Sequence, residues 1–189
     1  MVKSNRLERA VRAFAKTGKR VLGICGGFQL LGERIKDPLS VESNLEEVKG
    51  MGLLPITTTL EGQKVVRRVM GTCLQNQKRI NGYEIHMGLT GNTGRGGEPF
   101  LKIHAAGDRK SWTDGWVVSE GRIAGTYVHG ILDSPGFRGE FLNTLRKKKG
   151  MKERTSRQGR LARFHQYDRL ADHFEAYCDV EKIISRLSD

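Results

Sequence analysis

The chain has 189 residues, 37% of them hydrophobic and 29% charged, which is typical of a globular protein large enough to bury a core. No apolar run approaches the roughly 20 residues that a bilayer-spanning helix needs, and the N-terminus has no signal-peptide pattern. Thirty-three basic residues against 21 acidic ones give a net charge of +12. The densest basic run, 146–160, contains no aromatic residue for base stacking, and charge alone supplies only non-specific affinity. Nucleic-acid binding is therefore not expected, and neither is membrane attachment.

The cysteines give no sign of a metal site. Cys25, Cys73 and Cys178 are widely spaced, with no CxxC pattern and no Cys/His pair at zinc-ligand spacing. We therefore predict no metal, reduced thiols and a cytoplasmic location.

The first predicted elements form an α/β unit. Asn5 and Glu8 have the spacing of a capping box, and the helix that follows can end at Gly18. Residues 21–24 form a short apolar strand, and residues 28–35 resume a helical pattern. The order is helix, strand, turn, helix, as in the opening of an α/β domain.

Strands dominate the middle of the chain. Residues 115–130 predict a hairpin that turns at Glu120 and Gly121, and residues 91–97 predict a mobile loop that lacks a phosphate-loop ending. Four further strands are predicted before the hairpin, at 53–60, 64–71, 83–89 and 100–105.

The last third of the chain is predicted to be helical. Ser134 and Pro135 can start one helix, and residues 161–187 predict one or two more. No internal repeat and no second domain is visible, so we predict a single domain over 1–189.

A cysteine between glycines, at a strand-to-helix turn, is the main candidate for chemistry. Residues 23–27 read Gly-Ile-Cys-Gly-Gly, a G-x-C-x-G pattern that resembles a nucleophile elbow with sulfur in place of oxygen. Glycines at positions 23 and 27 would avoid a collision across the turn. The N–H groups at the helix start would favour a thiolate at Cys25 and stabilise an oxyanion. The alternative is a small buried cysteine with no chemical role, which is also the interpretation for Cys73 and Cys178.

A cysteine nucleophile needs a base, and the sequence favours His129 among five histidines. His129 ends an apolar strand, as Cys25 does, and active sites gather at the carboxyl edge of such sheets. The other histidines have no assigned chemical role; they are His86, His104, His165 and His173.

Four segments resemble the class I, triad-type glutamine amidotransferases, and within them the branch formed by the cobyric acid synthases. These segments are VLGICGGFQLLGERIKDP (21–38), GYEIHMG (82–88), GTYVHGILD (125–133) and YDRLADHFEAY (167–177). They occur in the family's order and span essentially the whole chain. The resemblance implies an α/β fold of the class I glutamine amidotransferase-like (flavodoxin-like) type, a mixed sheet with flanking helices.

The resemblance also implies roles for four residues. Cys25 would attack the side-chain amide of glutamine, and His129 would transfer the proton that lets ammonia leave. Gln29 matches a position that contacts the bound glutamine, and the Gly26 N–H would donate to the oxyanion. The ammonia would amidate carboxylates of a corrin ring in cobalamin biosynthesis.

Two departures from the family pattern leave alternatives open. Ile131 stands where the usual triad has glutamate, and Glu84 and Asp133 are the candidates to orient His129. The family's first strand, its PGS-like turn and its ATP-binding synthetase domain have no counterpart here, so we expect an N-terminally truncated chain. ATP and Mg are expected only in that synthetase domain.

The alternatives that remain concern activity and acceptor. The chain is either an active glutaminase, or an inactive or partner-dependent fragment or binding subunit of the same fold. The acceptor is a corrinoid, or another substrate as in cobyrinate a,c-diamide synthases or cell-wall enzymes.

Overall fold

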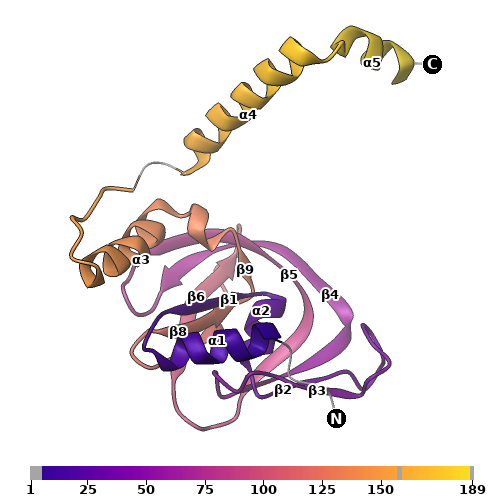
Figure 1. Cartoon of the computed structure of the whole chain (residues 1–189). Helices are drawn as coiled ribbons and strands as arrows, with labels where there is room; N and C mark the ends of the chain where they lie inside the picture. Colours follow the sequence, from indigo (N-terminus) through magenta and orange to yellow (C-terminus); the bar gives the residue numbers. More distant parts are fainter. Residues whose placement is uncertain (1–5, 157–158, 188–189) are drawn as a thin grey trace. The chain divides into compact units, whose positions relative to one another are not determined.

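The computed structural model describes residues 6–156 and 159–187, in two compact units, Met1–Ile131 and Leu132–Asp189 (Figure 1). The first unit carries the helices α1 (Arg6–Lys16) and α2 (Gly26–Leu31). Its strands are β1 (Val21–Ile24), β2 (Arg34–Lys36), β3 (Glu47–Lys49), β4 (Ile56–Cys73), β5 (Arg79–Asn92), β6 (Glu98–Ala105), β7 (Ser111–Val118), β8 (Ile123–Thr126) and β9 (Val128–His129). That both units form one domain stays a prediction.

The sheet is mixed, as predicted. β1 pairs with β8 in parallel and β2 pairs with β4 in parallel, whereas the other pairings are antiparallel. The expectation of an α/β fold with a mixed sheet and flanking helices is confirmed.

The antiparallel pairings close a ring. β5 pairs with β4 on one side and with β9 on the other, and β4 continues through β6 and β7 to β8. Only Tyr127 separates β8 from β9, and β9 pairs with β5, so the ring of strands closes at β5. The long curved strands β4 and β5 form one wall of this ring (Figure 1).

The two faces of the ring strands differ because side chains alternate across a sheet. The inward face holds core side chains that are at most 1% exposed, namely Val69, Cys73, Ile80, Leu101, Ile103 and Val128. The outward face of β4 and β5 carries exposed side chains such as Arg68, Met70 and Tyr83. The inside of the ring is therefore a core, and the outside of β4 and β5 is a surface.

Several local predictions are confirmed. β1 has the predicted bounds, and Gly18 follows α1 at a φ of 76°. The predicted hairpin joins β7 to β8, and its turn has positive φ at Ser119, Glu120 and Gly121. Asn5, the predicted cap of the first helix, lies outside the described residues.

Two local predictions are wrong. The helix predicted over 28–35 ends at Leu31, and residues 34–36 form β2 between β3 and β4. The chain turns extended at Gly32, the C-cap of α2, and passes so close to β4 that a Cβ there would lie 2.8 Å from the Ile56 carbonyl oxygen. The strands predicted at 53–60 and 64–71 are one strand, β4, with a register shift between Leu60 and Val65.

The second unit is helical, as predicted. The junction between the units falls in a 3-10 turn, η1 (Ile131–Asp133), and three helices follow: α3 (Pro135–Lys148), α4 (Gly159–Tyr177) and α5 (Val180–Leu187). Ser134 is the N-cap of α3 and Pro135 its first residue, where a missing N–H costs nothing. No helix among the described residues has the length and apolar character needed to cross a membrane.

Candidate active site

Cys25 occupies the tip of a strained turn between β1 and α2. Its φ of 54° and ψ of −117° lie where residues with a side chain are rarely found. Gly23 permits the turn, because a Cβ there would lie 2.7 Å from the Gly27 carbonyl oxygen and 2.6 Å from Leu31 Cδ1. The predicted reason for a glycine at position 23 is confirmed.

The predicted reason for the glycine at position 27 is wrong. A Cβ added to Gly26 or Gly27 meets no atom within 4 Å, and both residues are exposed. These glycines leave open space beside the first turn of α2, whose N–H groups have no intrahelical acceptor. The helix start can therefore accept a ligand group next to the sulfur.

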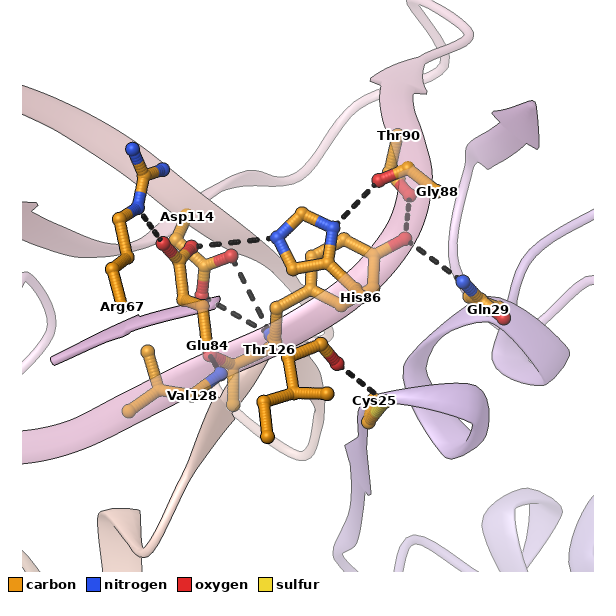
Figure 2. A network of polar contacts seen from close by, with 12 residues as sticks. Cys25, Gln29, Arg67, Glu84, His86, Gly88, Thr90, Asp114, Thr126 and Val128 are labelled. Carbon is orange, nitrogen blue, oxygen red and sulfur yellow. Dashed lines mark hydrogen bonds and ion pairs between the residues drawn. The ribbon is translucent and has the colours of Figure 1, made fainter. Parts of the chain in front are cut away.

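Hydrogen bonds connect the turn to two neighbouring strands. The Cys25 N–H donates to the Thr126 carbonyl at 2.9 Å, which joins the turn to β8. The half-buried Cys25 Sγ lies 3.4 Å from the Ile85 carbonyl oxygen, to which it donates (Figure 2). The thiol is free and faces the backbone of β5.

His129 lies at the same sheet edge as Cys25. The parallel pair β1 and β8 matches Ile24 with Thr126, so Cys25 follows one strand end and His129 lies shortly after the other. The imidazole of His129 stacks on Tyr83, its partner in β5, with centroids 5.1 Å apart and planes 8° apart. Its Nε2 is buried and has no hydrogen-bond partner among the described residues.

The structure places the two candidates to orient His129, Glu84 and Asp133, differently. Glu84 neighbours Tyr83 in β5, so its side chain lies on the other face of the strand, where it pairs with Arg67 at 2.5 Å. Glu84 is therefore placed away from the imidazole that stacks on Tyr83. Asp133 lies in η1, and its role as the orienting carboxylate stays a prediction.

Gln29 reaches from α2 to the interior side of β5. Its Nε2 donates to the Tyr127 hydroxyl at 3.2 Å, and that hydroxyl lies 2.6 Å from Thr90 Oγ1 (Figure 2). Gly88 makes this approach possible, because a Cβ there would lie 2.7 Å from the Gln29 amide nitrogen. Burial raises the pKa of Tyr127, so its hydroxyl stays protonated.

An interior polar cluster was not predicted. Its members come from four strands of the ring and are Arg67, Glu84, His86, Asp114 and Thr126 (Figure 2). His86 Nδ1 bonds the Gly88 carbonyl at 2.9 Å, which directs Nε2 toward Glu84, 3.8 Å away. The Thr126 hydroxyl donates to Asp114.

The pKa values of two carboxyl groups in this cluster are shifted in opposite directions. Burial raises the pKa of Glu84, but Arg67 and His86 lower it by more, so the carboxyl titrates below its usual range. Burial, together with the charge of Glu84, raises the pKa of Asp114 to about 6 despite the hydrogen bond from Thr126.

The interior polar cluster borders a cavity of about 280 Å³, lined also by Trp112, Trp116 and Tyr127. Among the described residues, no three His, Cys, Asp or Glu side chains are arranged to hold a metal ion. The sequence signal for the cluster was the alternation in GYEIHMG, which places Glu84 and His86 on one face of a strand.

The fold and the turn define an α/β protein with a cysteine elbow at the carboxyl edge of a mixed sheet. Residues 1–137 match the CobB/CobQ-like glutamine amidotransferase domain. This match spans more than half of the chain, and the chain therefore belongs to that family.

Curated relatives match almost the whole chain. The cobyric acid synthase of Clostridium botulinum (strain Kyoto / Type A2) is 40% identical over 182 residues, which cover 95% of this chain and 36% of the relative. That of Clostridium acetobutylicum is 40% identical over 184 residues, covering 97% and 37%, and that of Clostridium tetani is 39% identical over 178 residues, covering 94% and 35%. The chain thus spans little more than a third of the length of these relatives.

A solved structure described as a glutamine amidotransferase is 14% identical and covers 74% of this chain and 67% of its own. Its TM-score of 0.46 is too low to establish a shared fold.

Proposed function

We propose that this chain is the glutaminase portion of a cobyric acid synthase, with Cys25 as the nucleophile and His129 as the general acid and base. The observation that carries the proposal is the strained Cys25 elbow, whose sulfur lies beside an open helix start. Strain of this kind persists only where the surrounding structure holds it, and it concentrates at functional sites. Membership in the amidotransferase family supplies the reaction class.

The proposed reaction has two stages. His129 takes the proton of the Cys25 thiol, the sulfur attacks the side-chain carbonyl carbon of glutamine to form a C–S bond, and the Gly26 N–H stabilises the oxyanion. His129 passes a proton to the amide nitrogen, the C–N bond breaks, and ammonia leaves. Water then hydrolyses the glutamyl thioester, which releases glutamate and restores the thiol. Gln29, held by Tyr127, contacts the bound glutamine.

The acceptor and the partner belong to the same proposal. The relatives named cobyric acid synthase extend well beyond the matched part, and that further length would hold ATP, Mg and the activated corrin carboxylate. The family description covers CobB-like and CobQ-like domains, whereas the names of the relatives favour cobyric acid. A cytoplasmic location, and one amidotransferase domain over 1–189, complete the proposal.

The test is intact-mass analysis of the whole chain after incubation with a diazo-ketone analogue of glutamine. We expect one adduct, absent in Cys25→Ser and retained in Cys73→Ser, which removes a buried thiol elsewhere in the chain. An adduct that survives in Cys25→Ser would refute the assigned nucleophile. No adduct on the folded chain would show that the pocket forms only with the remaining part of the synthase.

A further inference from the structure

Thr126, at the end of β8, connects the two halves of the candidate active site. Its carbonyl oxygen accepts the Cys25 N–H at 2.9 Å. Its hydroxyl donates to the Asp114 carboxylate and accepts the Val128 N–H at 3.0 Å (Figure 2). Thr126 is 0% exposed and Asp114 is 7% exposed, so solvent hardly competes for these contacts. We call Thr126 and Asp114 the buried support, because they contact both the elbow and the segment that leads to His129.

The chain changes sheet partners just after Thr126. β8 pairs with β1 and β7, whereas β9 pairs with β5, and Tyr127 between them belongs to neither strand. A buried N–H at such a crossover costs free energy unless it finds an acceptor. The Asp114 carboxylate accepts the Tyr127 N–H, with Oδ2 at 3.3 Å and Oδ1 at 3.4 Å. Side chains of the buried support therefore accept the N–H groups of both residues that precede His129.

A close approach of β7 to β8 brings Asp114 to this crossover. Gly115 follows Asp114 at a φ of 73°, and a Cβ there would lie 2.2 Å from the Gly125 carbonyl oxygen. A side chain at position 115 would push the two strands apart, because it would meet backbone atoms that cannot rotate away. The glycine therefore keeps the carboxylate within reach of Thr126.

We propose that the buried support positions the candidate active site by holding Cys25 and His129 in a fixed relation; this inference rests on the proposed function. The Cys25 N–H is bonded to the support directly, and its φ of 54° persists only where the surroundings hold the residue. His129 is held through the two N–H groups that precede it. Thr126 is fully buried and touches no substrate, so it acts through Cys25 and His129 as a positioning residue.

A fixed relation between sulfur and imidazole matters for the proposed reaction. A general base must lie within hydrogen-bond reach of the proton that it takes. A displacement of about 1 Å can cost on the order of 10²-fold in rate. The His129 imidazole stacks on Tyr83 with centroids 5.1 Å apart, so this contact reports whether the segment after Thr126 is in place.

Three variants separate positioning from stability. Thr126→Val keeps the volume but removes the hydroxyl, so two buried polar groups lose a partner. Thr126→Ser keeps the hydroxyl and loses only a methyl group. The matched control is Asp37→Asn, because Asp37 is 3% exposed and accepts the N–H groups of residues 41–43, outside the candidate active site. The control should lower stability without acting on the candidate active site.

Two measurements on the whole chain report the positions of the two side chains. The first is the rate at which the diazo-ketone analogue of glutamine labels Cys25, followed by intact mass. The second is the NMR shift that the stacked Tyr83 ring causes in the His129 imidazole protons, with Tyr83→Leu as the unstacked reference. Thr126→Val should slow labelling by about tenfold or more and lose most of this shift. Thr126→Ser and Asp37→Asn should keep the shift and be labelled within about threefold of the wild-type rate.

Asp114→Asn gives a second test that preserves the side-chain volume, and it decides alone where Thr126→Val fails to fold. It replaces one acceptor oxygen by a donor and should change both measurements in the same direction as Thr126→Val. Wild-type labelling and stacking in both variants would overturn the proposal. Equal losses in Thr126→Ser or Asp37→Asn would overturn it too, because they would reflect stability alone. A wild-type chain that is not labelled defeats the proposed function alone, and the His129 shift then still decides on the buried support.

Discussion

The Cys25 elbow and the interior polar cluster both adjoin β5, yet they are built in different ways. The elbow is made by five consecutive residues, 23–27, and its strain is local to one residue. The cluster draws its side chains from strands far apart in sequence, and the ring buries its two carboxyl groups while the Arg67 side chain stays 41% exposed. A contiguous motif can thus specify a reactive side chain, whereas a buried charge network needs the whole sheet in register.

This difference decides what the sequence can predict. The strand over 21–24, the elbow and the hairpin turn at Glu120 and Gly121 follow from near neighbours, and they were predicted. The ion pair of Arg67 with Glu84 depends on the register between β4 and β5, and it was not predicted.

Errors in the predicted elements have the same origin. The helix pattern over 28–35 is locally consistent, but Gly32 and the neighbouring β4 end it and recruit residues 34–36 to the sheet. The paired position of His129 and Tyr83 depends on ring closure, which no local pattern reveals. The catalytic roles of Cys25, His129, Gly26 and Gln29 stay predictions.

The largest expected effect is on chemistry at the elbow. Cys25→Ala should reduce glutamine hydrolysis by about 10³-fold or more, because the nucleophile is lost. Its free energy of unfolding should change by less than about 0.5 kcal/mol, since the side chain is half-buried. Cys73→Ala is the matched control: hydrolysis should persist, while stability falls by about 1 kcal/mol or more because Cys73 is 1% exposed. Hydrolysis that survives in Cys25→Ala would contradict the assignment.

The next effect is on packing beside the elbow. Gly125→Ala places a Cβ 2.2 Å from a ring carbon of Phe28, so we expect the free energy of unfolding to fall by about 3 kcal/mol. Gly26→Ala meets no atom within 4 Å and should change stability by less than about 0.5 kcal/mol. Chemical denaturation of both variants measures the difference; equal stability would show that α2 can move away from β8.

The interior polar cluster should make stability depend on pH. The pKa of Asp114 is raised by burial to about 6 in the folded chain, from its ordinary value of 3.8, so the native state holds this proton more tightly than the unfolded state. Its stabilising contribution is present at low pH and is lost as pH rises through about 6. Between pH 5 and pH 8 this loss is on the order of 1 kcal/mol.

Asp114→Asn removes this titration and is the variant that tests it. Over the same interval, the free energy of unfolding of Asp114→Asn should change less with pH than that of the wild type, as measured by denaturation at each pH. Glu84, whose pKa is lowered, contributes in the opposite sense, and its contribution is lost only as pH falls below about 4.5. Parallel curves for wild type and Asp114→Asn would contradict the assigned titration.

The smallest effect concerns the strain at the elbow itself. Cys25→Gly should raise the free energy of unfolding by about 0.5–1 kcal/mol, because glycine tolerates φ 54° and ψ −117° at the expense of some chain entropy. Cys25→Ala retains a Cβ at the same φ and should show no such gain. Thermal denaturation compares the two variants, and an equal stability would mean that the turn stores no strain.

Ring closure also has a kinetic consequence. β9 joins β5 through only two residue pairs, Tyr83 with His129 and Glu84 with Val128, which link parts of the chain about 45 positions apart. Contacts between such distant segments form late in folding, and short terminal pairings open most readily. Amide hydrogens in the pairing of β9 with β5 should exchange with solvent before those of β4 and β6. Each opening of this pairing would carry His129 away from its stacked position. The lifetime of the short pairing between β9 and β5 would then set the fraction of time in which His129 is in position to react.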